Sequence, residues 1–264
     1  MTEAGAPLVF ITGASSGIGQ ALARRFRSAG WRLALVARRG DELRRFVAAQ
    51  SYAERDAQVY VADVADAASI TAAGRSCVQR QGLPDAVIAN AGISVGIDSA
   101  RIEDLQVLHD TLQTNVFGIA ATFQPFIDPM RQRRSGALVG VASVAGIRGL
   151  PGHAAYCASK AAAIAYCESL RGECRTSGVR VVTLVPGYID TPLTRGNPYP
   201  MPFLMPADAF ADAAFAAITA GTSYRVIPWQ MALVAKLLRA LPNVWFDRLL
   251  AGRARKPRRA DGAG

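Results

Sequence analysis

Short apolar runs alternate with longer segments of helical character along the first 190 residues of this 264-residue chain. The runs are rich in Val, Ile and Leu and show no strict apolar–polar alternation, which is typical of strands buried on both faces. A strand followed by a helix and another strand favours a parallel sheet with right-handed crossovers. The expected strands are Leu8–Ile11, Arg32–Ala37, Val59–Val61, Ala86–Ala89, Ala137–Val141, Val179–Val185 and Tyr224–Ile227.

The segments between these runs are long enough for helices, so the pattern predicts an α/β fold with a doubly wound parallel sheet of about seven strands and helices on both faces. No linker divides the first 190 residues and no repeat is present, and we expect one domain over residues 1–252. It would include a substrate lid at about 192–220 and a helical elaboration at 228–252. The basic tail, 253–264, is expected to be disordered. The expected helices are Gly17–Ala29, Asp41–Gln50, Asp66–Gln81, Ile102–Arg133, Ala154–Ser177 and Ala207–Ala220.

The composition narrows the class of protein. With 51% hydrophobic and 19% charged residues, intrinsic disorder is excluded. Four cysteines without a CxxC pair, and only two histidines, provide no zinc-site spacing, so we expect no metal and a reduced, cytoplasmic compartment. No apolar stretch reaches the ~18 residues that a membrane-spanning helix needs.

The formal charge of +10 is compatible with a nucleic acid, a membrane surface or an anionic ligand as partner. Since no nucleic-acid-binding motif is present, we expect no nucleic-acid partner. Trp229, Trp245 and Phe246 would suit a peripheral membrane contact. Packing against the lid or a second subunit is favoured, because Pro242 and scattered charges interrupt any long apolar stripe. Five of the positive charges lie in the tail, at Arg253, Arg255, Lys256, Arg258 and Arg259.

A glycine-rich loop directly follows the first expected strand and opens a helix. Glycines there allow a tight turn and let the backbone approach a pyrophosphate, which the free N–H groups of the helix N-terminus attract. The spacing is GxxxGxG. The position between the first strand and the first helix makes it a candidate dinucleotide site. The residues expected to contact the cofactor are Gly13, Ser15, Ser16, Gly17, Ile18 and Gly19.

The end of the second expected strand indicates which dinucleotide binds. An acidic residue there would hold the ribose 2′-hydroxyl of NAD, but this chain has Ala37 followed by Arg38 and Arg39. A guanidinium binds a 2′-phosphate with paired hydrogen bonds. The sequence therefore predicts NADP(H) as the cofactor in preference to NAD(H), with both arginines at the phosphate.

Further polar residues follow later strands. In an open parallel sheet, ligands lie beyond the carboxyl ends of the strands, so the residues that follow the third and fourth strands would face the cofactor. Ser143 follows the fifth strand, and Tyr156 and Lys160, four residues apart, share one helical face. The residues of the third and fourth strand ends are Asp63 and Val64, then Asn90, Ala91 and Gly92.

Ser143, Tyr156 and Lys160 suit the interconversion of an alcohol and a carbonyl. A carbonyl that accepts hydride must be protonated, and the tyrosine hydroxyl can supply that proton. A free tyrosine has a pKa of ~10, which a nearby ammonium such as that of Lys160 would lower. Ser143 would donate a hydrogen bond to the developing oxyanion.

This ordered set resembles the short-chain dehydrogenase/reductase family over about residues 8–191. The resemblance implies a Rossmann-like seven-stranded sheet, a nicotinamide cofactor and a Ser-Tyr-Lys-Asn tetrad, with homodimers or homotetramers as the usual assembly. It implies that Asn115 holds a water in a proton relay through Lys160, and that Tyr156 and Lys160 also contact the cofactor. It places the backbone of Ile189 and the hydroxyl of Thr191, after Pro186 and Gly187, on the nicotinamide carboxamide.

Several features weigh on substrate and activity. The lid between Thr191 and Ala207 is apolar, which favours a hydrophobic alcohol or carbonyl, although an apolar lid also serves to exclude water. Cys157 is interpreted as a buried filler and His153 as structural. The alternative function is a non-catalytic NADP-binding regulator or membrane-surface scaffold, and the complete tetrad argues against it.

Overall fold

The computed structural model describes residues 5–252 and 254–259. Within these residues, seven parallel strands form one sheet in the order β3-β2-β1-β4-β5-β6-β9. This confirms the predicted Rossmann-like doubly wound α/β fold. The strands are β1 Leu8–Thr12, β2 Arg32–Ala37, β3 Ala57–Val61, β4 Ala86–Ala89, β5 Gly136–Val141, β6 Val179–Pro186 and β9 Tyr224–Ile227.

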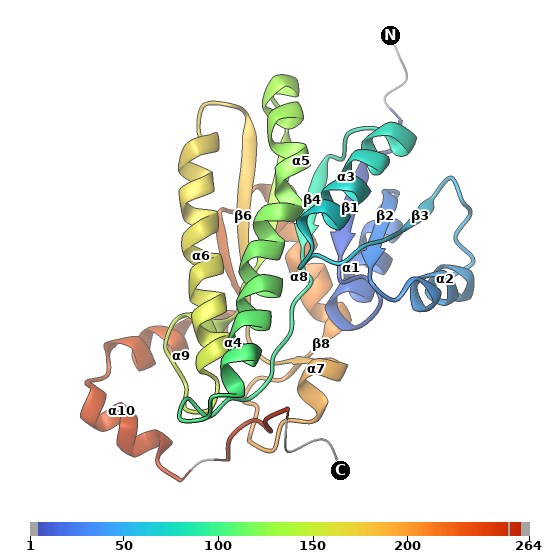
Figure 1. Ribbon diagram of the computed structural model, residues 1–264. Helices are drawn as coiled ribbons and strands as arrows, with labels where there is room; N and C mark the ends of the chain where they lie inside the picture. The colour runs from blue at the N-terminus through green and yellow to red at the C-terminus, as the bar shows by residue number, and fades with distance from the viewer. Residues whose placement is uncertain (1–4, 253, 260–264) are drawn as a thin grey trace.

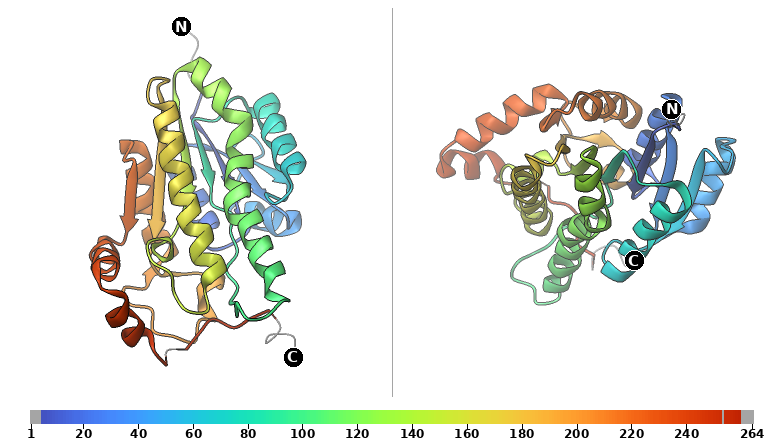
Figure 2. Two further views of the ribbon diagram at one scale, coloured as in Figure 1. Left: turned by 60° about the vertical axis from the view of Figure 1, so that its left-hand side comes forward. Right: turned by 90° about the horizontal axis from the view of Figure 1, so that it is seen from above.

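Helices cover both faces of this sheet (Figure 1). One face carries α3, α5 and α6, and the other carries α1, α2 and α8, so that the view from above in Figure 2 separates three layers. The order of the strands reverses on either side of β1, as a doubly wound topology requires. These helices are α1 Gly17–Ser28, α2 Gly40–Ala49, α3 Ala67–Gln81, α5 Gly118–Arg133, α6 Ala154–Cys174 and α8 Ala207–Ala220.

The central strands divide their side chains between two hydrophobic cores. In β1, Val9 and Ile11 pack toward α1, α2 and α8, whereas Leu8 and Phe10 pack toward α3, α5 and α6. Because successive side chains of a strand point to opposite faces, a strand between two helical layers must be apolar at every position. This explains why the strands of this chain are continuous apolar runs.

The long helix expected over Ile102–Arg133 is divided in the structure. An α-helix, α4, spans Asp104–Leu112, a π-helical turn spans Gln113–Phe117, and α5 continues from Gly118. Asn115 lies in that turn and is fully buried. A π-turn inserts one extra residue into the helical ladder, which changes the direction of its side chains, and such turns are frequent at functional sites.

The segments after β6 gather at the end of the molecule where the parallel strands finish (Figure 1). A short helix, α7 (Pro192–Arg195), lies there, and a two-residue strand β7 (Ile189–Asp190) pairs with β8 (Met205–Pro206). In contrast, α8 packs against α1 on the sheet face, although it falls within the expected lid. Two further helices, α9 (Trp229–Ala240) and α10 (Asn243–Leu250), follow β9.

Residues 254–259 run past this same end of the molecule in an irregular conformation (Figure 2). They are part of the tail expected to be disordered, yet they make specific contacts with the loop after β4 and with α4. The remaining tail residues, 253 and 260–264, lie outside the described residues. None of the helices in the described part of the chain has the length and apolarity needed to cross a membrane.

Candidate functional site

The glycine-rich loop turns between β1 and α1 as the sequence predicts. Gly13 has a φ of +66°, and a Cβ at this position would lie 2.8 Å from the Cα of Ala91. A side chain is therefore excluded here for two reasons, the backbone conformation and the close approach of the chain after β4. Among the described residues, the N-cap Ser16 makes no side-chain hydrogen bond to the first turn of α1. The free backbone N–H groups of the first turn of α1 are therefore suited to bind an anion.

Asn90 holds this loop against the end of β4. Its side-chain amide donates to the carbonyl oxygen of Thr12 at 3.0 Å, and its backbone N–H donates to the Thr12 hydroxyl at 3.1 Å. These bonds join the ends of β1 and β4, which are adjacent strands. Asn90, which the sequence predicts as a cofactor contact, therefore also fixes the shape of the glycine-rich loop.

A cleft of about 420 Å³ runs across the ends of the strands from this loop. Most of the predicted cofactor residues line it, whereas Gly19, Gly187 and Ile189 do not. Sequence reasoning missed several further lining residues, among them Thr114 and Leu193, because their exposure to the cleft depends on neighbouring elements. The predicted residues that line the cleft are Gly13, Ser15, Ser16, Gly17, Ile18, Arg38, Arg39, Asp63, Val64, Asn90, Ala91, Gly92, Tyr156, Lys160, Pro186 and Thr191.

Arg38 and Arg39 stand at the edge of the cleft with their side chains 66% and 61% exposed. Arg38 lies 3.7 Å from the carboxylate of Asp63, and Arg39 donates to the Ser15 hydroxyl in the glycine-rich loop at 3.3 Å. Arg39 also pairs with Glu42 at 3.0 Å. Two exposed guanidinium groups beside the glycine-rich loop give this end of the cleft positive charge, which is compatible with an anionic ligand.

Ser143 and Tyr156 face a second cavity, which has a volume of about 350 Å³. Tyr156 lines both this cavity and the cofactor cleft, while Lys160 lines the cleft and Ser143 the second cavity. Ser143 is the N-cap of a short turn after β5, where its hydroxyl accepts from the N–H of Ala145 at 3.2 Å. Ser143 and Tyr156, the two hydroxyl residues of the predicted catalytic set, therefore lie close to the junction of the two cavities.

Burial controls the acidity of the two titratable groups. It raises the pKa of Tyr156 to about 12, against a smaller lowering by the Ser143 hydroxyl. Burial also lowers the pKa of Lys160 to about 8. The Lys160 amine donates to the carbonyl oxygen of Val141 at 2.8 Å and lies 5.7 Å from the centre of the Tyr156 ring. The lowering of the tyrosine pKa expected from the Lys160 ammonium is not found in this structure, where the Ser143 hydroxyl is the group that lowers it.

Asn115 lies behind the cleft and does not line it. Its Oδ1 accepts from the N–H of Ile93 at 2.8 Å, and its Nδ2 donates to the Ile93 carbonyl and to the Ser159 hydroxyl, each at 2.9 Å. Ser159 in turn donates to the carbonyl of Tyr156 at 2.8 Å. The asparagine thus connects the loop after β4 to the helix that carries Tyr156 and Lys160.

The wall of the second cavity is mostly apolar and comes from segments that are distant in the sequence. Tyr188 contributes from the turn after β6, and Leu193 and Tyr199 contribute from the expected lid. Four leucine and valine side chains come from α9 and α10, namely Val234, Leu238, Leu249 and Leu250. His153, which sequence reasoning treated as structural, also lines this cavity, and its Nε2 lies 3.0 Å from the Tyr199 hydroxyl. Sequence reasoning also missed Arg148 and Lys256, because no local pattern marks them.

The cysteines have no part in this arrangement. All four lie among the described residues and are buried as free thiols. Burial raises the pKa of the Cys157 thiol, which disfavours the reactive thiolate. Within the described ranges, no cluster of three or more His, Cys, Asp or Glu side chains has the arrangement of a metal site.

Comparisons with known proteins agree with this geometry. The sequence profile of the family described as short chain dehydrogenase matches residues 7–199. An uncharacterised oxidoreductase of Myxococcus xanthus (strain DK1622) is 36% identical over 247 residues, which cover 94% of this chain and 97% of the relative. Another uncharacterised oxidoreductase, from Mycobacterium tuberculosis, is 37% identical over 241 residues, covering 89% and 93% of the two chains.

Solved structures show the same likeness. An alcohol dehydrogenase from the archaeon Thermococcus sibiricus, complexed with 5-hydroxy-NADP, superposes with a TM-score of 0.75 at 26% identity, covering 84% of this chain and 95% of the other. Levodione reductase superposes with a TM-score of 0.77 at 26% identity, with coverages of 86% and 98%.

Proposed function

This chain belongs to the short-chain dehydrogenase family, and on that premise we propose that it is an NADP(H)-dependent oxidoreductase that interconverts an alcohol and a carbonyl in an apolar small molecule. The observation that carries the proposal is the position of Tyr156 in the wall shared by the cofactor cleft and the second cavity. A proton donor at that junction can reach a carbonyl that lies against the cofactor.

The residues around the cleft fit a nicotinamide dinucleotide. The glycine-rich loop and the uncapped start of α1 would hold the pyrophosphate, and Arg38 and Arg39 would hold the 2′-phosphate of NADP. Pro186 and Thr191, which line the cleft, would lie at the nicotinamide end, and the backbone of Ile189 would lie between them in sequence. When bound, the cofactor supplies or accepts the hydride. The preference for NADP(H) over NAD(H) rests on the two arginines and on the absence of an acidic residue at Ala37.

Each of the polar side chains then has a defined task. Tyr156, protonated at neutral pH because burial raises its pKa to about 12, donates its proton to the substrate oxygen during carbonyl reduction. Ser143 donates a hydrogen bond to the same oxygen and polarises the carbonyl. Lys160 supplies positive charge at the nicotinamide end of the cleft and, when the tyrosine is deprotonated, stabilises the tyrosinate.

Asn115 acts behind these groups. A Cβ on Gly92 would lie 3.2 Å from the Asn115 Oδ1 and 3.5 Å from the Lys160 amine. The side chains of Asn115 and Lys160 therefore both approach the backbone of Gly92. We assign to Asn115 the support of a proton relay through Lys160, with a water between them.

Turnover with a panel of ketones, aldehydes and alcohols tests the proposal. The protein should consume NADPH with at least one apolar carbonyl, measured as loss of absorbance at the nicotinamide band, and NADH should be the poorer cofactor. Binding of NADPH without turnover of any member would instead support a non-catalytic cofactor-binding protein. Equal use of NADH and NADPH would contradict the assignment of the arginines.

We also propose that the chain assembles as a homodimer or homotetramer. Ile102, just before α4, and Leu105, within it, are 80% and 55% exposed, which suits a helix face that packs against a second copy. On α9, Trp229, Leu233 and Leu237 form a second exposed apolar row.

Light scattering coupled to size exclusion gives the oligomeric state. Flotation with anionic vesicles tests whether the α9 row contacts a membrane instead.

A further inference from the structure

Residues 254–259, here called the C-terminal strap, contribute one side chain to the wall of the second cavity. Lys256 lines the cavity together with Ser143 and Tyr156. The strap lies directly on the loop after β4, because the N–H of Gly96 donates to the carbonyl of Pro257 at 3.0 Å. A Cβ on Gly96 would collide with the carbonyl oxygen of Lys256, so only glycine allows the two backbones to approach this closely.

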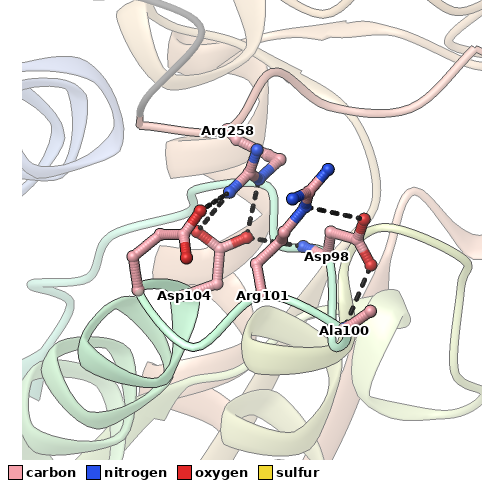
Figure 3. A network of polar contacts seen from close by, with 6 residues as sticks. Asp98, Ala100, Arg101, Asp104 and Arg258 are labelled. Carbon is pink, nitrogen blue, oxygen red and sulfur yellow. Dashed lines mark hydrogen bonds and ion pairs between the residues drawn. The ribbon is translucent and has the colours of Figure 1, made fainter.

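A buried ion pair fixes the strap in this position (Figure 3). The guanidinium of Arg258 binds both carboxylate oxygens of Asp104, at 2.7 and 3.2 Å, and reaches Glu103 at 3.0 Å. Asp104 is only 4% exposed and also accepts from the N–H of Asp98 at 2.7 Å. The hydrogen bond from Arg258, followed by that from Asp98, lowers the pKa of this carboxyl group. A bidentate pair to a buried carboxylate holds the backbone two residues from Lys256.

The Lys256 side chain is half-buried and lies at the mostly apolar wall of the second cavity. Its amine donates to the carbonyl oxygen of Leu193 in α7 at 3.1 Å, which uses one of its three N–H groups. Among the described residues, no carboxylate lies within ion-pair distance of this amine, and no Asp or Glu lines the cavity. Burial lowers the pKa of Lys256, which reflects the cost of keeping this charge away from water.

The other cation of the cavity wall, Arg148, is already engaged. Its guanidinium donates to the carbonyls of Leu238 and Leu241 and to the side chain of Asn243, and it stacks 3.8 Å from the centre of the Phe246 ring. These contacts satisfy it as a structural group at the end of α9. Among the described residues, Lys256 is therefore the wall cation that retains hydrogen-bonding capacity for a ligand.

We propose that Lys256 binds an anionic group of the substrate, so that the enzyme acts on apolar ketones or alcohols that carry a carboxylate. The inference rests on the proposed function and adds the substrate class. An amphipathic acid matches the cavity, because its chain would contact the leucine-rich wall from α9 and α10 while its carboxylate would pair with the ammonium. Arg258 is a positioning residue, since it acts only through the strap.

Binding to the NADPH-loaded protein tests the charge without depending on turnover. Calorimetry with decanoate and with decanamide, which have the same chain and similar size, should show the acid bound about 10- to 100-fold more tightly, the range of a charge-assisted contact. Lys256→Met should remove this difference and leave the affinity for decanamide unchanged, and Lys256→Arg should restore part of it. Arg259→Ala, which removes a charge from the same strap, is the matched control.

Arg258→Ala tests the positioning. It should reduce the discrimination between acid and amide while the affinity for the amide persists, a pattern that general loss of structure would not produce. The inference is overturned if decanoate and decanamide bind equally or not at all, or if Lys256→Met weakens NADPH instead of decanoate.

Turnover separates this inference from the proposed function. Medium-chain oxo acids should be reduced with a lower KM than their methyl esters, and Lys256→Met should make the two values equal. If esters and other neutral ketones are reduced while the acids are not, the proposed function stands and the anion site is wrong. If no carbonyl compound is reduced, the proposed function fails, and the calorimetry still decides whether the cation binds a carboxylate.

Discussion

Lys160 donates a 2.8 Å hydrogen bond to the carbonyl oxygen of Val141, at the end of β5. This bond holds the amine at the base of the cofactor cleft, where it is 4% exposed as a residue and where burial lowers its pKa to about 8. The charge of this lysine is therefore sensitive to pH in a range where the protein can be assayed. The fold places this titrating amine in the same cleft as Tyr156.

The first prediction concerns pH. Because the folded pKa of Lys160 is lowered, the ammonium is present below about pH 8 and is lost as the pH rises through that value. The kcat/KM for carbonyl reduction, which reports the free enzyme, should be constant below about pH 8 and fall above it. Lys160→Met should be less active and lack this ionisation. A profile of the unmodified protein that stays level through pH 9 would contradict the assignment.

The second prediction concerns Tyr156. Tyr156→Phe removes the proton donor and should lower kcat by about 10²- to 10⁴-fold, the usual contribution of a general acid. The dissociation constant for NADPH, measured by fluorescence titration, should change little, since the ring still lines the cleft. Tyr166→Phe, on the same helix α6 but outside both cavities, is the control and should retain activity. Full turnover in Tyr156→Phe would disprove the proposed mechanism.

The third prediction concerns the choice of cofactor. Replacing Arg38 and Arg39 by alanine should raise the KM for NADPH by about 10- to 100-fold, because charge-assisted bonds to a phosphate are lost. The KM for NADH, which has no 2′-phosphate, should stay nearly constant. Arg44→Ala is the matched control, since this arginine lies on α2 and pairs with Asp41. An equal loss with both cofactors would mean that the arginines do not read the phosphate.

The fourth prediction concerns stability. Asn115→Ala leaves both half-buried backbone groups of Ile93 without their side-chain partners. Each unpaired group costs about 1–3 kcal/mol, so for the two groups the free energy of unfolding in urea should fall by about 2–6 kcal/mol. Ser159→Ala, which leaves the Ile93 bonds in place, should cost less. A variant as stable as the unmodified protein would show that water replaces the asparagine.

The fifth prediction concerns the attachment of α9 and α10. Arg148→Met removes the bonds to Leu241 and Asn243 and the stacking on Phe246. In the variant, local opening of this region no longer has to break these contacts and is therefore more frequent. Limited proteolysis should then cleave the connection between the two helices at least about 10-fold faster. Arg239→Met, exposed on α9, should not change the cleavage rate. Cleavage elsewhere in the chain would point to general destabilisation.

Local patterns made much of this molecule predictable. The apolar runs marked all seven strands of the sheet, because a strand between two helical layers must be apolar throughout. The loop after β1 and the four-residue spacing of Tyr156 and Lys160 marked the cleft, because both depend on geometry within one element or one turn. For these features, a few adjacent residues contain the determining interactions.

Other features depend on contacts that adjacent residues do not encode. The π-helical turn at Asn115 is accompanied by hydrogen bonds to Ile93 and Ser159, and neither partner can be identified from the helix itself. Lys256 looked like one charge among many in a basic tail. Its place in the cavity follows from the packing of the strap on Gly96, at a distance of about 160 residues along the chain.

The strap also bears on the order in which the molecule becomes functional. The ribosome releases a chain from its N-terminus onward, and the residues that line the cofactor cleft lie between Gly13 and Leu193. The wall that includes Leu249, Leu250 and Lys256 is synthesised later. The residues that line the cleft therefore leave the ribosome before the leucines and the lysine that close the second cavity, and α8, which packs against α1, is made between the two groups.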